Sequence, residues 1–272
     1  MTTLQAPTAT GTPIVAVVTG AARGIGAAVA RRLSADGWRL VLVDSCADDP
    51  AVDYGLATRA ELDAVVKACG DEAIGYVADV RDQTALGEAV ALALDRFGGL
   101  DAAIAVAGLI AGGPNTWDTD DELWTAMIDV NLAGVWRLVR AAVPAMLGRP
   151  VPRRGRFVAV ASAGGIVGLP RLGAYVAAKH GVVGLVRSLA AELGPEGITA
   201  NVVAPGSTRT EALNASAAVY GLSNPEDFAV HHLVPRLLEP DEVAAAVVWL
   251  CEERSSGVTG IVVPVDAGMT AR

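Results

Sequence analysis

The chain has 272 residues, and 52% of them are hydrophobic, which is typical of a globular protein with a sizeable core. Its formal net charge of -9 and isoelectric point near 4.8 argue against a nucleic-acid partner, because phosphate binding requires a basic face. No apolar run approaches the roughly 18 residues that a membrane-spanning helix needs, so no membrane segment is expected.

The amino-terminal stretch, residues 1–13, lacks both the basic start and the apolar core of a secretory signal, and we expect a disordered tail. Three cysteines without metal-ligand spacing suit free thiols in a reducing compartment, which indicates a cytoplasmic protein. A basic cluster, Arg153, Arg154 and Arg156, is interpreted as a solvated loop.

Seven short β-branched runs alternate along the chain with longer amphipathic segments of about 3.6-residue periodicity. The runs, which we expect to be strands, are residues 14–19, 38–44, 73–79, 100–106, 156–162, 198–204 and 260–266. Strands that are apolar on both faces belong in a parallel sheet covered by helices on each side. The sequence therefore predicts an α/β, Rossmann-type doubly wound fold with a seven-stranded parallel sheet, in a single domain over residues 14–272.

Two segments are too long to be simple connections between such elements. The first runs from about Ser45 to Arg59 and is part of an insertion over residues 45–70; the second runs over residues 207–240. Long excursions at the carboxyl ends of parallel strands usually build the ligand site.

The first predicted strand leads directly into the glycine turn "TGAARGIG", residues 19–26, and then into a predicted helix. This order directs backbone N–H groups and the positive end of the helix dipole at an anion. Gly20, Gly24 and Gly26 permit the close approach of a pyrophosphate, with Arg23 and Ile25 between them. For the glycines alone, a tight structural turn remains the alternative.

Asp44 ends the second predicted strand, about eighteen residues after the last of these glycines. A carboxylate at this place accepts hydrogen bonds from the adenosine ribose and repels a 2'-phosphate, which favours NAD over NADP. Arg23 is the opposing signal, because an arginine in the turn could attract that phosphate.

Tyr175 and Lys179 stand four residues apart, a spacing that puts both side chains on one face of a helix. A phenol with a pKa near 10 is a poor acid-base catalyst at neutral pH unless a nearby cation stabilises its phenolate. Lys179 would supply that cation, and Ser162, at the end of a predicted strand, would hydrogen-bond a substrate oxygen. The plain alternative is a half-buried aromatic beside a surface charge.

With these features the sequence resembles the short-chain dehydrogenase/reductase family over residues 14–270. The motifs that carry the resemblance are the glycine turn, "ADV" at 78–80, "VAG" at 106–108, "DVN" at 129–131, Ser162, "YVAAK" at 175–179 and "PGSTRT" at 205–210. It implies that Asn131 completes a catalytic tetrad with Ser162, Tyr175 and Lys179. Tyr175 and Lys179 would also contact the cofactor.

The resemblance also implies further contacts with NAD. Asp79 and Val80 should meet the adenine and Ala107 and Gly108 the adenosine side. The nicotinamide should meet residues of the last motif, namely Pro205, Gly206, Thr208 and Thr210. The chain departs from the family in one place: Ala105 and Val106 replace the usual two asparagines, which removes a polar link near the cofactor.

The insertion over residues 45–70, together with "VPVDAG" near the carboxyl terminus, resembles the subgroup related to carveol dehydrogenase and described as mycofactocin-coupled. In that subgroup the insertion is thought to trap NAD, so that electrons leave through mycofactocin, a peptide-derived redox carrier. Tyr54 and the turn at residues 48–50 would be parts of the lid. A surface loop or a subunit contact is the other interpretation of the insertion.

The expected activity is therefore NAD-dependent interconversion of a small apolar alcohol and its ketone or aldehyde. Residues of the second excursion that could line the substrate pocket, or only pack its lid, are Leu213, Tyr220, Leu222 and Phe228. Two alternatives remain: an ordinary dehydrogenase or ketoreductase with freely exchanging NAD(H), and a non-catalytic NAD-binding sensor or scaffold. His231 and His232 lack further ligands at suitable spacing, so no metal is expected. The resemblance implies a homotetramer.

Overall fold

A computed structural model describes residues 14–271, and the predicted tail at residues 1–13 lies outside them. Its centre is one parallel sheet in the order β3-β2-β1-β4-β5-β6-β7. The strands are β1 (Val15–Thr19), β2 (Arg39–Asp44), β3 (Ala73–Val77), β4 (Ala102–Ala105), β5 (Arg156–Val160), β6 (Thr199–Pro205) and β7 (Val262–Val265). The predicted doubly wound α/β fold with seven parallel strands is therefore confirmed.

All strands except β6 are one to three residues shorter than the apolar runs that predicted them. β3 ends at Val77, before Asp79, and β5 ends at Val160, before Ser162. Both side chains were expected at strand ends but lie on the connections that follow. The apolar runs extend further than the ladder of hydrogen bonds because the first loop residues at this edge are also buried, as Ala78 and Ala161 are.

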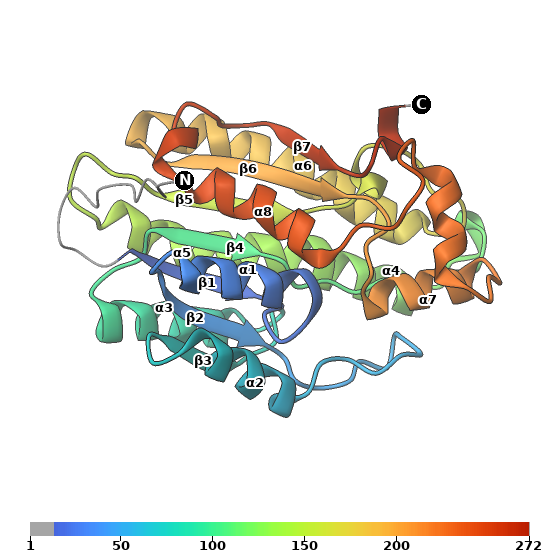
Figure 1. Ribbon diagram of the computed structural model, residues 1–272, viewed down its shortest axis with the longest axis horizontal. Helices are drawn as coiled ribbons and strands as arrows, with labels where there is room; N and C mark the ends of the chain where they lie inside the picture. Colours follow the sequence, from blue (N-terminus) through green and yellow to red (C-terminus); the bar gives the residue numbers. More distant parts are fainter. Residues whose placement is uncertain (1–13, 272) are drawn as a thin grey trace, which may run out of the picture.

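Two helical layers cover the sheet, with α1, α2 and α8 on one face and α3 to α6 on the other (Figure 1). The helices are α1 (Gly24–Ala35), α2 (Arg59–Cys69), α3 (Gln83–Phe97), α4 (Asp121–Ile128), α5 (Gly134–Leu147), α6 (Gly173–Leu193), α7 (Glu211–Val219) and α8 (Pro240–Cys251). Alternate residues of each strand enter opposite layers: Val17 belongs to one core cluster and Val18 to the other. This double burial explains why the strands are apolar throughout.

The helical run Asp121–Leu147 joins α4 and α5 through a π-helical turn, η2 (Asp129–Ala133). By length and composition alone it could cross a membrane, and 39% of its most apolar window is buried. The run packs on α3 and α6, and it buries Met127, Leu138 and Met146 completely in the core. Core helices of globular proteins have the same composition.

The predicted solvated basic loop is wrong for one of its three arginines. Arg156 begins β5, and only 2% of its surface is exposed. It lies at the amino edge of the sheet, and charge patterning along the sequence does not reveal its burial.

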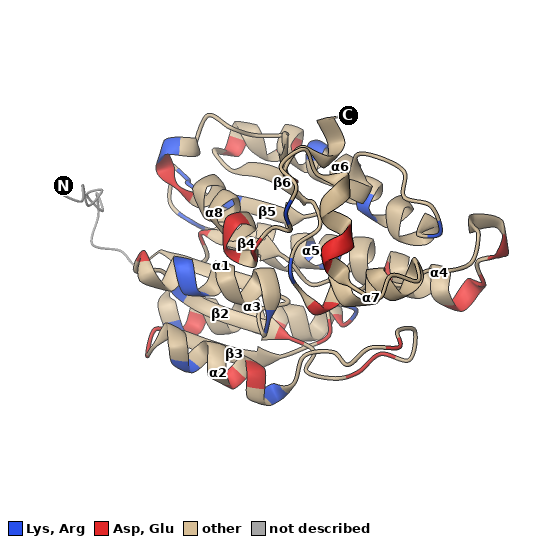
Figure 2. Ribbon diagram, turned by 45° about the vertical axis from the view of Figure 1, so that its right-hand side comes forward, with Lys and Arg blue, Asp and Glu red and all other residues tan. Residues whose placement is uncertain are grey.

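Both long excursions leave the carboxyl edge of the sheet, on the right in Figure 1. The first is irregular from residue 45 to residue 58 and continues into α2, and the second contains α7 and the short helix η5 (Pro225–His231). Figure 2 shows acidic segments on the projecting loop after β2 and on the stretch leading into α4. An anionic ligand at this edge must therefore be held by local N–H groups and arginines.

Candidate active site

The glycine turn lies between β1 and α1 and packs closely against the loop that follows β4. A Cβ added at Gly20 would stand 2.6 Å from the backbone nitrogen of Ala107, and one at Gly26 would stand 2.0 Å from the carbonyl oxygen of Gly20. Gly20 also has a positive φ of 68°. No side chain in the described part of the chain caps the amino end of α1. The first N–H groups of the helix are therefore available to an anion.

A groove of about 610 Å³ runs along this turn. All residues assigned by sequence to the phosphates and the adenosine line it: Gly20, Arg23, Gly24, Ile25, Gly26, Asp44, Asp79, Val80, Ala107 and Gly108. The carboxylate of Asp44 accepts a hydrogen bond of 3.0 Å from Ala22 N–H, which ties the end of β2 to the turn. A cradle that a single Cβ would fill, with the carboxylate of Asp44 in the same groove, fits a dinucleotide.

The first excursion closes one side of the groove through three contacts. Arg23 donates a hydrogen bond of 2.8 Å to the carbonyl of Gly55. The hydroxyl of Tyr54 accepts one of 3.1 Å from the N–H of Ile110. Asp49, which is 5% exposed, forms an ion pair of 2.8 Å with Arg81.

Arg81 connects the excursion with the floor of the groove, because it also pairs with Asp79 at 2.6 Å. Burial raises the pKa of Asp79, but the hydrogen bonds and the charge of Arg81 outweigh it and hold that pKa below its usual value. Nothing in the sequence marks Arg81 as part of the site; its role depends on a fold that brings residues 49 and 81 together.

A second pocket of about 560 Å³ adjoins the groove, and Ile25, Val106, Gly108 and Leu109 line both. It brings together the four side chains that the sequence nominated for catalysis: Asn131, Ser162, Tyr175 and Lys179. Tyr175 and Lys179 lie on successive turns of α6, with the ammonium 5.6 Å from the centre of the phenol ring. Lys179 is buried and donates a hydrogen bond of 3.2 Å to the carbonyl of Val160.

Desolvation dominates the acid-base properties of this pair. Burial raises the pKa of Tyr175 to about 12, although a hydrogen bond with Ser162 acts in the opposite direction. Burial lowers the pKa of Lys179 to about 8. Desolvation of the phenol is thus a larger effect than its hydrogen bond with Ser162, and the acidification of Tyr175 by Lys179 together with an oxidised nicotinamide stays a prediction. A positive charge beside the phenol would act against this desolvation.

Asn131 is completely buried in the π-helical turn η2. Its Oδ1 accepts a hydrogen bond of 3.2 Å from Leu109 N–H, and its Nδ2 donates one of 3.1 Å to the carbonyl of Met127. A Cβ at Gly108 would stand 2.7 Å from Asn131 Oδ1 and 3.3 Å from Lys179 Nζ. The amide and the ammonium therefore face the same small space, which only a glycine leaves open.

Apolar side chains of the second excursion close the pocket. Leu213, Tyr220, Leu222 and Phe228 all line it. They also form a separate apolar cluster with Leu237, so lining the pocket and packing the lid are not exclusive interpretations. The hydroxyl of Tyr220 donates a hydrogen bond of 2.7 Å to the carbonyl of Pro170, which joins α7 to the loop after β5.

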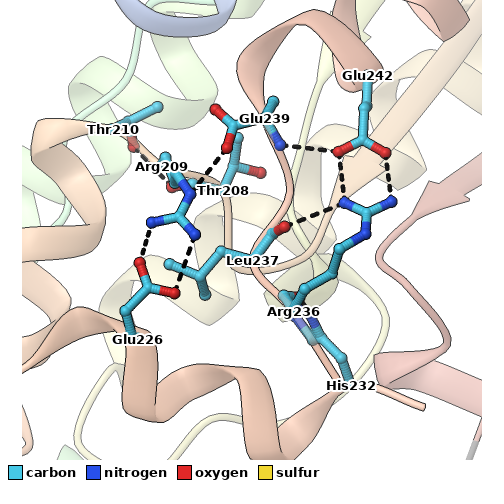
Figure 3. Close-up of polar contacts among 9 residues, drawn as sticks. All are labelled: Thr208, Arg209, Thr210, Glu226, His232, Arg236, Leu237, Glu239 and Glu242. Carbon is cyan, nitrogen blue, oxygen red and sulfur yellow. Dashed lines mark hydrogen bonds and ion pairs between the residues drawn. The ribbon is translucent and has the colours of Figure 1, made fainter. Parts of the chain in front are cut away.

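Charged contacts hold the base of this excursion (Figure 3). Arg209 bridges Glu226 of η5 and Glu239 before α8, and Arg236 pairs with Glu242 at 2.7 Å. Arg209 stands between Thr208 and Thr210, so the same bridge fixes the last motif beside the pocket. Thr208 lines the pocket with Pro205 and Gly206, and Thr210 lines both pocket and groove.

His232 has a structural role that the sequence does not reveal, where it was considered only as a possible metal ligand. It is 1% exposed, and its Nε2 accepts a hydrogen bond of 3.2 Å from Ser207 N–H. That bond requires the proton on Nδ1, which donates at 2.6 Å to the carbonyl of Arg236. Among residues 14–271, no three His, Cys, Asp or Glu side chains gather in a way that could hold a metal ion.

Comparison with known proteins gives one family model, described as Enoyl-(Acyl carrier protein) reductase, that matches residues 20–270. An uncharacterized oxidoreductase of Mycobacterium tuberculosis (strain CDC 1551 / Oshkosh) is 40% identical over 265 residues, which cover 93% of this chain and 95% of the relative. The (-)-trans-carveol dehydrogenase of Rhodococcus erythropolis is 38% identical over 272 residues, which cover 95% of this chain and 98% of the relative.

Among solved structures, the carveol dehydrogenase from Mycobacterium avium in complex with NAD is similar over nearly the whole chain. The TM-score is 0.90 and the sequence identity 34%, with 96% of this chain and 99% of that chain covered. The similarity thus includes both excursions as well as the sheet.

Proposed function

The chain belongs to the short-chain dehydrogenase/reductase family, and on that premise we propose that it interconverts an alcohol and its ketone or aldehyde by hydride transfer with NAD. One observation carries the proposal. Ser162, Tyr175 and Lys179 converge in an apolar pocket that opens into a groove built on a glycine turn. A dinucleotide in the groove would have its reactive end beside these three side chains.

In the proposed reaction, Tyr175 Oη takes the proton of the alcohol, and Ser162 Oγ orients the substrate oxygen by a hydrogen bond. Bound NAD would supply the hydride acceptor and, when oxidised, a positive charge beside the phenol. Lys179, with its pKa lowered to about 8 by burial, is still mostly protonated at neutral pH and adds a second charge. Asn131 faces Lys179 across Gly108 and supports a proton path at the ammonium.

The proposed substrate is a small apolar alcohol. Apolar side chains dominate the wall opposite the candidate catalytic residues, and the polar groups concentrate where the substrate oxygen would lie. Two similar proteins are named carveol dehydrogenases, which supports a cyclic terpenoid alcohol such as carveol. Free cysteines are consistent with the cytoplasmic location that we propose.

We further propose that residues 45–58 retain NAD between turnovers and that the electrons leave through mycofactocin. The support is the set of three contacts of this excursion: Arg23 with Gly55, Asp49 with Arg81, and Tyr54 with Ile110. They join residues 45–58 to residues that line or adjoin the groove, and we propose that they break when a bound dinucleotide leaves. An ordinary dehydrogenase with exchanging NAD(H) is the competing function.

The test is a panel of alcohols assayed with an artificial electron acceptor and no added NAD, on protein that has been dialysed exhaustively. Turnover together with the absorbance of bound nicotinamide supports a retained cofactor. Turnover that requires added NAD supports the exchanging enzyme. Absence of turnover under both conditions, with NAD bound, would point to a sensor and contradict the catalytic proposal.

A homotetramer completes the proposal. Trp124 on α4 and Trp136 on α5 are 43% and 44% exposed, unusually high for indole rings on two neighbouring core helices. Packing of α4 and α5 against other copies of the chain would bury these indole rings. Light scattering during size-exclusion chromatography should give the mass of four chains, and a Trp136→Glu variant should give a smaller species. A wild-type monomer would refute it.

A further inference from the structure

A small cavity of about 140 Å³ lies at the amino edge of the sheet, on the side of the molecule away from the groove. Its walls come from the starts of β5 and β6 and from the short helix η6 (Glu253–Ser255), on the left in Figure 1. Arginines line it on one side: Arg153, Arg154 and Arg156. The proposed hydride transfer gives this cavity no role.

One edge of the Arg156 guanidinium, formed by Nε and Nη2, is unsatisfied at this cavity. Its side chain is 3% exposed, and its Nη1 donates a hydrogen bond of 3.0 Å to the carbonyl of Gly155. Its Nε is buried and has no hydrogen-bond partner among residues 14–271. Elsewhere in the protein, Arg149 uses the Nε and Nη2 edge as a fork, with both bonds to Asp101 at 2.8 Å. The same edge of Arg156 is not satisfied, which is costly for a buried guanidinium.

Glu253 is a poor hydrogen-bond partner for this edge of Arg156. Its carboxylate stands 3.6 Å from Arg156 Nη2 and 3.8 Å from Arg154 Nε, beyond normal hydrogen-bond length. The side chain is 63% exposed and therefore free to swing outward. One carboxylate serves two guanidinium groups, so the cluster keeps an excess of one positive charge. Arg153 does not add to that excess, because it pairs with Glu196 at 2.8 Å.

Hydroxyl groups complete the wall. Thr259 Oγ1 accepts a hydrogen bond of 3.1 Å from Ala200 N–H, which leaves its own proton for another acceptor. Ser256 also lines the cavity. The exposed Arg154 can reach the same space, since its side chain is 54% exposed at the mouth.

We propose that this cavity binds a phosphate group, free or as a monoester, between Arg154 and Arg156 after Glu253 swings away. A tetrahedral dianion can accept from the Arg156 fork, from Arg154 and from Thr259 at the same time. A free carboxylate would only replace the single charge of Glu253. Binding here joins β5, β6 and the end of α8, and so it stabilises the amino edge of the sheet.

Calorimetric titration with inorganic phosphate at constant ionic strength tests the proposal, with saturating NAD so that the groove cannot contribute. Wild type should bind one phosphate per chain. Arg154→Ala should bind it at least about tenfold more weakly, the effect of losing about 1.4 kcal/mol of charge-assisted contact. Arg187→Ala, which removes an exposed arginine of α6, is the matched control and should bind as wild type does.

Glu253→Gln gives the opposite change, because it removes the competing carboxylate and should strengthen phosphate binding severalfold. Thermal unfolding supplies a second readout, since a ligand that binds only the folded chain raises the melting temperature in proportion to RT ln(1 + [L]/Kd). Glycerol phosphate that binds as well as inorganic phosphate would identify a monoester as the ligand. Equal binding of acetate, unchanged binding by Arg154→Ala, or no saturable binding in wild type would overturn the proposal.

Discussion

The candidate catalytic residues and the two excursions that cover them are built in contrasting ways. Asn131 and Lys179 are buried in helices, and their positions are fixed by hydrogen bonds to the backbone. The excursions, residues 45–58 and 207–240, contain ion pairs with at least one partly exposed partner and single hydrogen bonds, and the second also has a small apolar cluster. Exposed ion pairs contribute about 0–1 kcal/mol each. A change of one atom in a catalytic side chain should therefore lower kcat strongly, whereas a change of one contact in an excursion should alter the rate of NAD release only a little.

The largest effect is expected for Tyr175→Phe. Removing one oxygen removes the proposed proton acceptor, so kcat should fall about a thousandfold, the usual contribution of a positioned acid-base group. NAD binding and the melting temperature should change little. Tyr76→Phe, which removes an exposed hydroxyl bonded to Glu88, is the control and should retain full activity. If the Tyr175→Phe variant had a normal kcat, Tyr175 would not be the proton acceptor.

Gly20→Ala should weaken NAD binding about 10- to 100-fold, because the added carbon overpacks the turn by about 1–3 kcal/mol. Its Cβ would stand 2.6 Å from Ala107 N. Gly37→Ala is the matched control, since Gly37 also has a positive φ, 82°, but nothing within 4 Å of an added Cβ. Fluorescence titration with NAD compares the two. Similar losses in both variants would show that backbone strain, and not close approach, limits binding.

Lys179→Met should stabilise the protein while it abolishes activity. Burial lowers the pKa of Lys179 to about 8, whereas an unfolded lysine titrates near about 10.4. Between these values the unfolded chain binds the extra proton, so wild-type stability rises with pH. Below pH 8 the ammonium of Lys179 is buried in its charged form, which costs the full free energy of its desolvation. The variant should therefore be more stable by about 1–3 kcal/mol there.

Urea unfolding from pH 7 to pH 10.5 measures that difference. It should shrink as the pH rises through the interval between the two pKa values. A methionine variant less stable than wild type at pH 7 would mean that the ammonium contributes more through Val160 than burial costs.

The smallest effect is expected in the first excursion. Tyr54→Phe keeps the ring and removes the hydroxyl that accepts from Ile110 N–H. Loss of one hydrogen bond of about 1 kcal/mol should speed NAD release about fivefold. Stopped-flow displacement of bound NAD measures the rate, and kcat with saturating cofactor should not change. A release rate equal to wild type would remove this contact from the proposed lid.

Much of the fold could be predicted because its signals are local. The strands are apolar on both faces, and the glycine turn follows the first of them, so the fold class, the alternation of strands and helices and the place of the groove could all be predicted from the sequence. Tyr175 and Lys179 were predictable for the same reason, since their four-residue spacing is a property of one helix.

What could not be predicted depends on contacts between distant segments. Arg81 reaches Asp49, and His232 ties Ser207 to Arg236, without any motif that pairs them. The rise in the pKa of Tyr175 could not be predicted either, because desolvation of the phenol depends on how the pocket packs around it. Burial of Arg156 at a strand start is a third example.

The most direct test of the central claim follows the hydride itself. Carveol carrying deuterium on its carbinol carbon is mixed with the NAD-loaded enzyme, and the nucleotide is analysed by mass spectrometry after a single turnover. The account predicts one deuterium on the reduced nicotinamide from wild type and none from Tyr175→Phe. Equal labelling by both proteins, or label released to water by wild type, would contradict proton transfer at Tyr175 coupled to hydride transfer at the groove.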